Sequence, residues 1–238
     1  MGDELPQWLV PLAEAARSVD AAELARFLPP DDGSGRASAV LIAFTETADG
    51  PSLLLIQRAA DMRNHAGQVA FPGGAVDAAD PTHVSAALRE AEEEVGLDPD
   101  SVHVFGELPA LYLPPSGFVV TPVLAWWSSA HPVAAVDPAE VARVAIVPVA
   151  ELADPANRFR VQHPSGLLGP GFDAGGLYVW GFTALLVDRL LALGGWARAW
   201  DESLTRPLPA DVAGSRLAPS EPPPTSAPEV VPSPAEDD

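Results

Sequence analysis

The segment REAEEEVG, residues 89–96, places four carboxylates between Glu90 and Glu94. Like charges three and four residues apart on a helix repel by about a few tenths of a kcal/mol per pair, so the run needs solvent or a cation to compensate it. If residues 82–95 form a helix, Glu90, Glu93 and Glu94 share one face of it. Hard divalent cations such as Mg²⁺ prefer oxygen ligands and bind substrate phosphates at the same time. The pattern therefore indicates either a metal site or an acidic face that is only solvated.

The other positions of this segment define the predicted helix. Its apolar stripe is expected to face the core and consists of Val84, Ala87, Leu88, Ala91 and Val95. Asp80 predicts the N-cap, and Gly96 predicts a left-handed C-cap. Just upstream, the segment QVAFPGG, residues 68–74, ends in glycines that let the backbone approach a ligand without side chains in between. A loop of this kind beside an acidic helix is suited to hold a cation against a diphosphate.

The composition limits the classes of function. The chain has 238 residues, of which 47% are hydrophobic, enough for one domain with a sizeable core. Its 13 basic residues are all arginines and its net charge is −20, which argues against binding along a nucleic-acid backbone. The chain has no cysteine, and Asp188 and Arg189 interrupt the apolar stretch TALLVDRLLALGG, so neither disulfides nor a membrane span are expected. Because the acidic N-terminal segment is also unlike a signal peptide, the sequence predicts a soluble, cytoplasmic protein.

The chain divides into three predicted parts. Residues 1–36 form an N-terminal extension with one helix over 5–28. Residues 37–204 form an α/β domain, in which strand-like and helical patterns alternate. The strands are expected at 37–44, 52–58, 101–108, 118–127 and 140–149, and the helices at 82–95 and 180–194. Residues 205–238, rich in proline and acidic side chains, are expected to form a disordered tail.

The acidic helix and the loop before it resemble the Nudix box. This box is a glycine, a spaced acid and the string Arg-Glu-apolar-x-Glu-Glu-x-Gly-apolar, matched here by Gly74, Arg89, Glu90, Glu93, Glu94, Gly96 and Leu97. A second, upstream signature resembles that of coenzyme A pyrophosphatase-like Nudix hydrolases and consists of Leu54, Leu55, Arg58, Arg63, Gly67 and the segment FPGG. The segments SGFVVTPVLA and WGFTALLV also look like this subgroup, so the resemblance covers residues 37–195.

The sequence departs from these patterns at a few positions. Asp80 stands where the general box has glutamate, and its spacing to Arg89 is one residue longer. Both features are typical of the subgroup. In the upstream signature, Ile56 replaces a threonine and Ala59 replaces a serine. These two replacements leave the acidic residues intact but weaken the assignment of the substrate.

The resemblance implies both a fold and a reaction. The fold is an α/β/α sandwich, in which a mixed sheet lies between helices and the box forms a loop, a helix and a loop. The reaction is hydrolysis of a diphosphate bond with Mg²⁺ or Mn²⁺ bound. In the subgroup, coenzyme A or acyl-coenzyme A gives 4′-phosphopantetheine, or its acyl form, and adenosine 3′,5′-bisphosphate. The implied partner is a small nucleotide substrate, without nucleic acid or membrane, and a homodimer remains open.

The resemblance also implies roles for the acidic residues. Glu90 and Glu94 are the first candidates for metal ligands, and Glu93 is a further ligand or orients the attacking water. A backbone carbonyl at Gly73 or Gly74 would complete the metal shell.

Arginines of the two motifs are the next candidates. Arg89 is expected to hold a glutamate in place. The predicted substrate contacts are Arg58, Arg63, Gly67, Phe71 and Gly73. Arg58 and Arg63 either bind phosphates, including the 3′-phosphate of coenzyme A, or pair with Asp61 and solvent. Glu140 is a weaker candidate for a general base, and an exposed strand start is the alternative for this residue.

Two other functions remain open from the sequence. One is hydrolysis of another nucleoside diphosphate derivative such as ADP-ribose, which Ile56 and Ala59 leave room for. The other is a non-catalytic Nudix domain that only senses a nucleotide. The presence of all three box glutamates, Glu90, Glu93 and Glu94, argues against the second.

Overall fold

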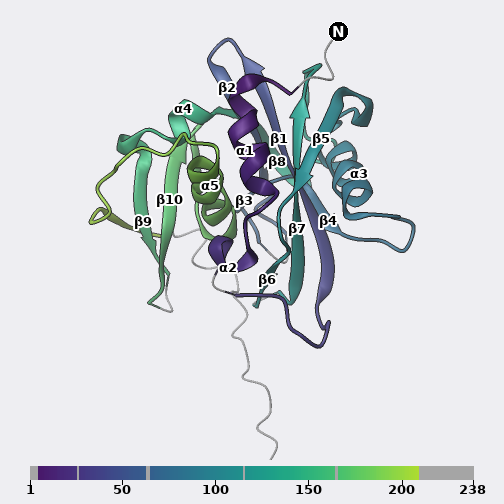
Figure 1. Ribbon diagram of the computed structural model, residues 1–238, viewed down its shortest axis with the longest axis horizontal. Helices are drawn as coiled ribbons and strands as arrows, with labels where there is room; N and C mark the ends of the chain where they lie inside the picture. The colour runs from purple at the N-terminus through teal and green to yellow at the C-terminus, as the bar shows by residue number, and fades with distance from the viewer. Residues whose placement is uncertain (1–4, 26, 63–64, 115, 164–165, 209–238) are drawn as a thin grey trace, which may run out of the picture.

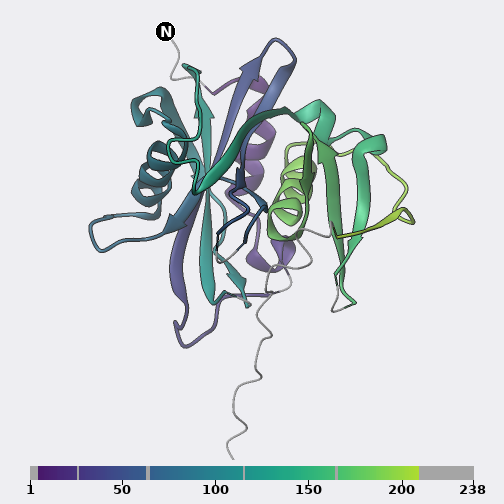
Figure 2. The same cartoon turned by 180° about the vertical axis from the view of Figure 1, so that it is seen from behind.

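A mixed β-sheet with helices on both faces forms the centre of the fold (Figures 1 and 2). The computed structural model describes residues 5–25, 27–62, 65–114, 116–163 and 166–208. The strands of the main sheet are β1 (Arg36–Thr47), β2 (Gly50–Arg58), β3 (Val69–Ala70), β4 (Gly73–Ala75), β5 (Val102–Glu107), β6 (Leu111–Leu113), β7 (Phe118–Trp127) and β8 (Val141–Pro148). Their order is β3-β2-β1-β7-β5, and β4, β6 and β8 pair with β1, β7 and β2 respectively. β1 and β7 run parallel, while the other pairs are antiparallel.

Helices cover the two faces of this sheet. On one face, α3 (His83–Val95) packs against residues of β1, β2 and β7. On the other face, α1 (Val10–Ala16), α2 (Ala21–Leu24) and α5 (Gly181–Leu193) share a second core cluster with β1 and β2. Figure 1 shows α3 on the opposite side of the sheet from α1 and α5. The predicted α/β fold with a mixed sheet between helices is therefore confirmed.

Most of the predicted elements are found in the structure. The strands β1, β2, β5, β7 and β8, and the helices α3 and α5, lie within three residues of their predicted bounds. Long apolar runs mark these strands, and each of them has buried side chains in the sheet or partly buried ones packed against it. Short 3₁₀ and helical turns connect the main elements: η2 (Pro99–Ser101), α4 (Val149–Leu152) and η3 (Pro155–Asn157).

The N-terminal extension is not the single helix that the sequence predicted. It consists of a 3₁₀ turn, η1 (Gln7–Leu9), followed by α1 and α2. The chain breaks between the two helices at Asp20, whose backbone N–H donates to the Glu23 carboxylate at 3.1 Å. This capping interaction favours a new helix start at Asp20 over a continuous helix. Leu12 of α1 and Leu24 of α2 are nevertheless both buried, so the broken extension still covers the sheet.

A second sheet, which the sequence did not predict, lies beyond α5 (Figure 1). Its strands are β9 (Arg158–Gln162), β10 (Leu168–Ala174), β11 (Leu177–Val179) and β12 (Thr205–Pro207), in the order β11-β10-β9-β12. Phe172 of β10 packs in the same core cluster as residues of α5. The segment LGPGFDA that forms β10 contains two glycines and a proline, which hide the strand pattern in the sequence.

A buried arginine joins this second sheet to α5. Arg158 is 3% exposed and donates through Nη2 to the Asp188 carboxylate on α5. Its guanidinium carbon also lies 5.0 Å from the centroid of the Phe172 ring and 4.7 Å from that of the Trp200 ring. The charge is therefore paired on one side and covered by aromatic faces on the others.

The start of the predicted tail requires a correction. Residues 205–207 form β12, which pairs in parallel with β9. Arg206 holds this strand, because its guanidinium lies 4.3 Å from the Phe159 ring centroid and its Nη1 lies 3.2 Å from an Asp173 oxygen. The folded part therefore extends through Leu208, which is buried. The remainder of the predicted tail, 209–238, lies outside the described residues.

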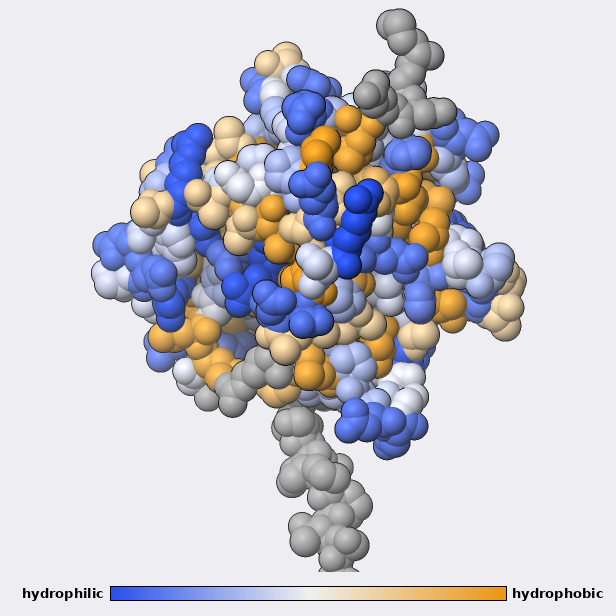
Figure 3. All heavy atoms as spheres, viewed as in Figure 1, coloured by the Kyte–Doolittle hydropathy of each residue, from blue (hydrophilic) through white to orange (hydrophobic). Residues whose placement is uncertain are grey.

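Two surface properties complete the description. Within the described ranges, no helix has the length and apolarity required to cross a membrane. On the face that carries α1 and α5, polar and apolar side chains are interspersed (Figure 3). Such mixing is typical of protein surfaces, since apolar atoms contribute about half of most accessible surfaces.

Candidate active site

Helix α3 begins and ends at two defined caps. The Thr82 hydroxyl accepts a hydrogen bond from the Ser85 N–H at 3.1 Å, and the Thr82 N–H donates to the Ser85 hydroxyl at 2.9 Å. Gly96 ends the helix in the left-handed region, with φ of 69°. The C-cap prediction is thus confirmed, whereas the N-cap prediction at Asp80 is wrong by two residues. Asp80 instead pairs with Arg89 of the helix.

Small side chains bring α3 close to the sheet. The face of the helix that meets β1 and β7 includes three fully buried alanines: Ala86, Ala87 and Ala91. The exposed fraction of the carboxylate side chains differs strongly along the helix, being 6% for Glu94, 19% for Glu90 and 60% for Glu93. A helical wheel puts these three carboxylates away from the apolar stripe, where each is expected to be exposed. Glu94 is buried because the loop at Gly73 covers it, so this part of the expectation is corrected.

The two glycines after Pro72 make the close approach to α3. Gly73, at φ 156°, donates its N–H to Glu94 Oε2 at 3.0 Å. A Cβ at Gly73 would collide with the carbonyl oxygen of Ala39, and a Cβ at Gly74 would occupy the space of the Glu90 carboxylate. The Gly74 carbonyl accepts a hydrogen bond from the Ser38 hydroxyl at 2.6 Å. Glycine is therefore required at Gly73 for close pairing of β4 with β1, and at Gly74 for the close approach of β4 to Glu90.

Arg89 links the helix to the segment that precedes it. Its Nε and Nη2 donate to the two oxygens of Asp80 at 3.1 and 2.9 Å, in a bidentate pair. Nη2 also donates to the Ala75 carbonyl at 3.2 Å, and Nη1 donates to Glu90 Oε1 at 3.0 Å and Glu93 Oε2 at 3.1 Å. Arg89 therefore contacts two of the three box glutamates and the end of β4 at the same time.

The residues of the upstream signature have different positions in the structure. Arg58, at the end of β2, approaches Glu94, and its Nη1 lies 3.7 Å from Glu94 Oε1. Gly67 forms a turn whose carbonyl accepts from Gln57 Nε2 at 3.3 Å. Phe71, predicted to contact the substrate, is 3% exposed and belongs to the core, directly before the Pro72–Gly74 segment. Arg63 lies outside the described residues.

The electrostatics of the site set the two inner glutamates apart. Burial raises the pKa of Glu94 to about 7, although the Gly73 N–H and Arg58 oppose this, and the negative charges of Glu90 and Glu140 raise it further. Burial also raises the pKa of Glu90, against the influence of Arg89. The hydrogen bonds from Arg89 lower the pKa of Asp80. Glu140, which precedes β8, thus belongs to the electrostatic environment of Glu94.

These features fit a divalent cation. Glu90 and Glu94 lie one helical turn apart and are both largely removed from water, and burial raises the pKa of each although an arginine lies near it. A hard cation would compensate such a pair with oxygen ligands. No ready-made group of three or more His, Asp or Glu ligands is found among the described residues. The geometry brings together Glu90, Glu94 and the Gly73–Gly74 backbone, whereas Glu93 is turned toward Arg89 at the helix edge.

Two hydroxyl residues that support this site were not found from the sequence. Ser38 holds the Gly74 carbonyl, as described above. Thr183 of α5, which is 6% exposed, donates to the carbonyl of Val69 on β3 at 2.8 Å. Both are buried hydroxyls with apolar residues on either side of them in the sequence. This pattern is the only sequence signal that could have identified them.

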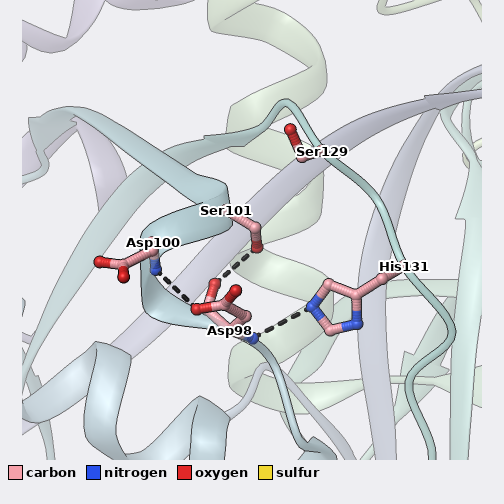
Figure 4. A pocket seen from close by; sticks show the side chains of 5 residues that line it. All are labelled: Asp98, Asp100, Ser101, Ser129 and His131. Carbon is pink, nitrogen blue, oxygen red and sulfur yellow. Dashed lines mark hydrogen bonds between the residues drawn. The ribbon is translucent and has the colours of Figure 1, made fainter.

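A separate hollow lies beyond the C-terminal end of α3 (Figure 4). It has a volume of about 450 Å³ and is lined by Asp98, Asp100, Ser101, Ser129 and His131. The Asp98 N–H donates to His131 Nε2 at 3.1 Å, and the Asp98 side chain accepts from the Asp100 N–H at 3.0 Å. The glutamates and glycines described above, Gly73, Gly74, Glu90, Glu93 and Glu94, are called the Glu94 region. None of them lines this hollow, so the two sites are distinct.

Glu94 lies within a segment of the chain that is similar to known proteins. A family model described as the NUDIX domain matches residues 35–165. An uncharacterized Nudix hydrolase NudL from Citrobacter koseri is 43% identical over 164 residues, covering 65% of this chain and 81% of the relative. An uncharacterized Nudix hydrolase NudL from Klebsiella aerogenes is 55% identical over 89 residues, covering 37% of this chain and 72% of the relative.

The crystal structure of a Nudix hydrolase from M. smegmatis, RenU, is 22% identical and has a TM-score of 0.46. The match covers 67% of this chain and 86% of that chain.

Proposed function

Because the chain belongs to the Nudix hydrolase family and is a pyrophosphohydrolase, we propose that it hydrolyses the diphosphate bond of coenzyme A or acyl-coenzyme A. The products are 4′-phosphopantetheine, or its acyl form, and adenosine 3′,5′-bisphosphate. The observation that carries this proposal is the approach of Arg58, from the upstream signature, to Glu94 of the box helix at 3.7 Å. A residue of the signature that resembles the coenzyme A subgroup, Arg58, thus lies beside a residue of the general box, Glu94.

The two departures from the upstream signature bear less on the substrate than the sequence suggested. Ile56 is fully buried and packs between the main sheet and α3, and Ala59 is 7% exposed. Neither side chain faces solvent to any extent, so the replacements change packing and not the surface that meets a substrate. By contrast, 24% of the Arg58 side chain is exposed, so this residue is accessible to a substrate.

The acidic residues have distinct roles in this proposal. Glu90 and Glu94 would hold Mg²⁺ or Mn²⁺, with Glu93 and a carbonyl of Gly73 or Gly74 as further ligands. When bound, the cation would stabilise negative charge on the diphosphate and help a water molecule to lose its proton. Glu94 is fixed by the Gly73 N–H on Oε2, which leaves Oε1 directed toward Arg58.

Arginines position the reacting groups. Arg89 holds Glu90 and Glu93 in one network, so that Glu93, at the helix edge, can orient the attacking water. Arg58 contributes a guanidinium for the phosphates. Water attacks one phosphorus, the bond between that phosphorus and the bridging oxygen breaks, and the leaving phosphate keeps the electron pair. Glu140, whose negative charge raises the pKa of Glu94, is a candidate to accept the proton of the water.

A second candidate substrate is another nucleoside diphosphate derivative, such as ADP-ribose. The observation that favours it is that Glu90, Glu94 and the Gly73–Gly74 backbone would engage any diphosphate in the same way, whatever group it carries. A non-catalytic nucleotide sensor is disfavoured, because a sensor does not need a buried carboxylate that resists ionisation.

The proposal is tested by incubating the purified protein with coenzyme A and Mg²⁺ or Mn²⁺. Formation of adenosine 3′,5′-bisphosphate is followed by chromatography, with ADP-ribose as a parallel substrate and the Glu94→Gln variant as a control. Metal-dependent product from coenzyme A that Glu94→Gln does not form supports the proposal. Turnover of ADP-ribose alone would reject coenzyme A and keep the pyrophosphohydrolase. We also propose a cytoplasmic location, which cell fractionation tests.

A further inference from the structure

Arg58 occupies an irregular position at the end of β2. The pairing of β2 with β8 shifts register between Gln57 and Arg58, which marks a β-bulge. The Arg58 N–H nevertheless donates to the Gln68 carbonyl at 2.9 Å, so the backbone at this point is fixed. Bulges occur next to active sites because they redirect a side chain out of the regular alternation. Here the redirected side chain approaches Glu94.

The contact between Arg58 and Glu94 is incomplete. The distance of 3.7 Å between Nη1 and Oε1 is within the range of an ion pair but beyond that of a hydrogen bond. The Arg58 Nε is buried and has no hydrogen-bond partner among the residues that the structure describes. A buried donor without a partner is unfavourable, so Arg58 is held near Glu94 by charge and not by good geometry. This arrangement differs from that of Arg89, whose guanidinium makes five hydrogen bonds.

Glu94 has few sources of positive charge within the described part of the chain. Its neighbours Glu90 and Glu140 are acidic, and the Gly73 N–H is the one hydrogen-bond donor to it among the described residues. Arg89 is committed to Asp80, Glu90, Glu93 and Ala75. Among the described residues, Arg58 is therefore the cationic side chain that forms an ion pair with the Glu94 carboxylate.

We propose that Arg58 is the resident counter-ion of Glu94, and that it competes with the divalent cation for this carboxylate and turns to the substrate phosphate when the cation binds. The inference rests on the proposed function, because it assumes that Glu94 takes a cation. Two positive groups cannot share Glu94 Oε1 without repelling each other. A released Arg58 has its Nε and Nη groups free for a bidentate contact with a phosphate.

The proposal predicts that one substitution strengthens cation binding and weakens the interaction with the substrate. Arg58→Met removes the competitor, so the affinity for the cation should increase. The same variant removes a phosphate ligand, so KM for the substrate should also increase. A general loss of structure would weaken both interactions, whereas the proposed exchange strengthens the first and weakens the second.

The decisive experiment measures Mn²⁺ binding to the substrate-free protein by electron paramagnetic resonance. At low ionic strength we expect Arg58→Met to bind Mn²⁺ about fivefold more tightly than the wild type, and salt should reduce this difference. Arg58→Lys keeps the charge and should stay within about twofold of the wild type. Arg160→Met is the matched control, because Arg160 lies on the second sheet, on the other side of the molecule from α3 (Figure 1), and its loss changes the net charge equally.

The outcomes separate this inference from the proposed function. Unchanged or weaker Mn²⁺ binding in Arg58→Met would overturn the inference, since Arg58 would then support Glu94 as a ligand. If Glu94→Gln loses the Mn²⁺ site in the same series, the metal assignment still stands. If Glu94→Gln binds Mn²⁺ like the wild type, both the metal assignment and the inference fail. Thermal unfolding of each variant establishes that the folded protein is measured.

Discussion

Two buried charged residues, Arg158 and Glu94, differ in how closely partners of opposite charge approach them. Arg158 is 3% exposed, donates to Asp188 and is covered by the rings of Phe172 and Trp200. Glu94 is 6% exposed, yet it has a distant ion pair with Arg58, one backbone hydrogen bond and acidic neighbours. A buried charge that has a close ion-pair partner and aromatic rings around it joins parts of the structure, whereas one with weak compensation is available for a ligand. The difference supports the proposal that the second sheet is structural and that the Glu94 region is the functional site.

The largest expected effect is the loss of turnover in Glu94→Gln. The amide keeps the size of the side chain but removes the negative charge, so the kcat should fall by at least about a hundredfold through weaker metal binding. Steady-state kinetics at a fixed Mn²⁺ concentration that just saturates the wild type measure the effect, and circular dichroism checks the fold. A variant that turns over like the wild type would show that Glu94 is only another structural charge.

The matching change in the second sheet should act on stability instead of turnover. Arg158→Met leaves Asp188 without its partner, and Asp188 is 28% exposed, so we expect a decrease of about 3 kcal/mol in the free energy of unfolding. Urea denaturation measures this decrease. The turnover per folded molecule should remain within about twofold of the wild type, because Arg158 is not part of the Glu94 region.

The double variant Arg158→Met, Asp188→Leu sharpens this test. Replacing both partners removes the unpaired charge, so the double variant should recover part of the stability that Arg158→Met loses. If Arg158→Met instead lowers kcat strongly while leaving the stability unchanged, the division between a structural and a functional charge is wrong.

A smaller effect is expected in the pH dependence of stability. Burial raises the pKa of Glu94 to about 7 in the folded protein, compared with an ordinary value of 4.5. The folded state therefore binds more protons than the unfolded state between these values, and the free energy of unfolding should decrease as the pH rises. This contribution is fully present below the ordinary pKa and is lost as the pH passes through about 7. For the metal-free protein we expect a loss of about 2 kcal/mol between pH 5 and pH 8.

A comparison of the wild type with Glu94→Gln isolates the contribution of Glu94 to the pH dependence of stability. Glu94→Gln should flatten the pH dependence in urea denaturation, because the amide does not titrate. Saturating Mn²⁺ should also stabilise the wild type at pH 8, since the cation favours the ionised carboxylate. Identical pH profiles for the wild type and Glu94→Gln would show that the charge of Glu94 is better compensated than the contacts indicate.

The elements that the sequence predicted well are those with long apolar patterns. The alanines of α3 and the apolar run of β7 face the core wherever the sheet is placed, so their periodicity alone predicts them. The second sheet was missed because β10 carries Gly169, Pro170 and Gly171 in the place of an apolar alternation. The N-terminal break at Asp20 depends on a cap that competes with a continuous helix over only a few residues.

The candidate site was only partly predictable for a different reason. Residue types and spacing indicated Glu90, Glu93 and Glu94 together, but a helical wheel treats every carboxylate as solvent-facing. Which of them is buried depends on where the Gly73 loop crosses the helix, and this crossing is a tertiary feature. The role of Asp80 as the partner of Arg89 also depends on the path of the chain after β4. Tertiary contacts therefore distinguish the three glutamates, while the local sequence does not.

The smallest predicted effect concerns the connection between the two sides of the main sheet. Thr183 of α5 donates to the carbonyl of Val69 on β3, and the chain reaches Gly73 four residues later. Thr183→Val keeps the shape of the side chain but leaves this buried carbonyl without its donor, so we expect kcat to fall about fivefold, corresponding to about 1 kcal/mol. Thr183→Ser keeps the hydroxyl and should retain most of the wild-type kcat.

The NMR resonance of the Gly73 amide provides the second measurement for Thr183. If Thr183 positions the loop, the Gly73 signal should move in Thr183→Val and stay near its wild-type position in Thr183→Ser, because this N–H is the donor to Glu94. A purely structural hydroxyl would lower the stability of Thr183→Val and leave both kcat and the Gly73 signal unchanged. In that case α5 would belong with Arg158 to the structural part of the molecule, and the boundary between the two regions would run along β3.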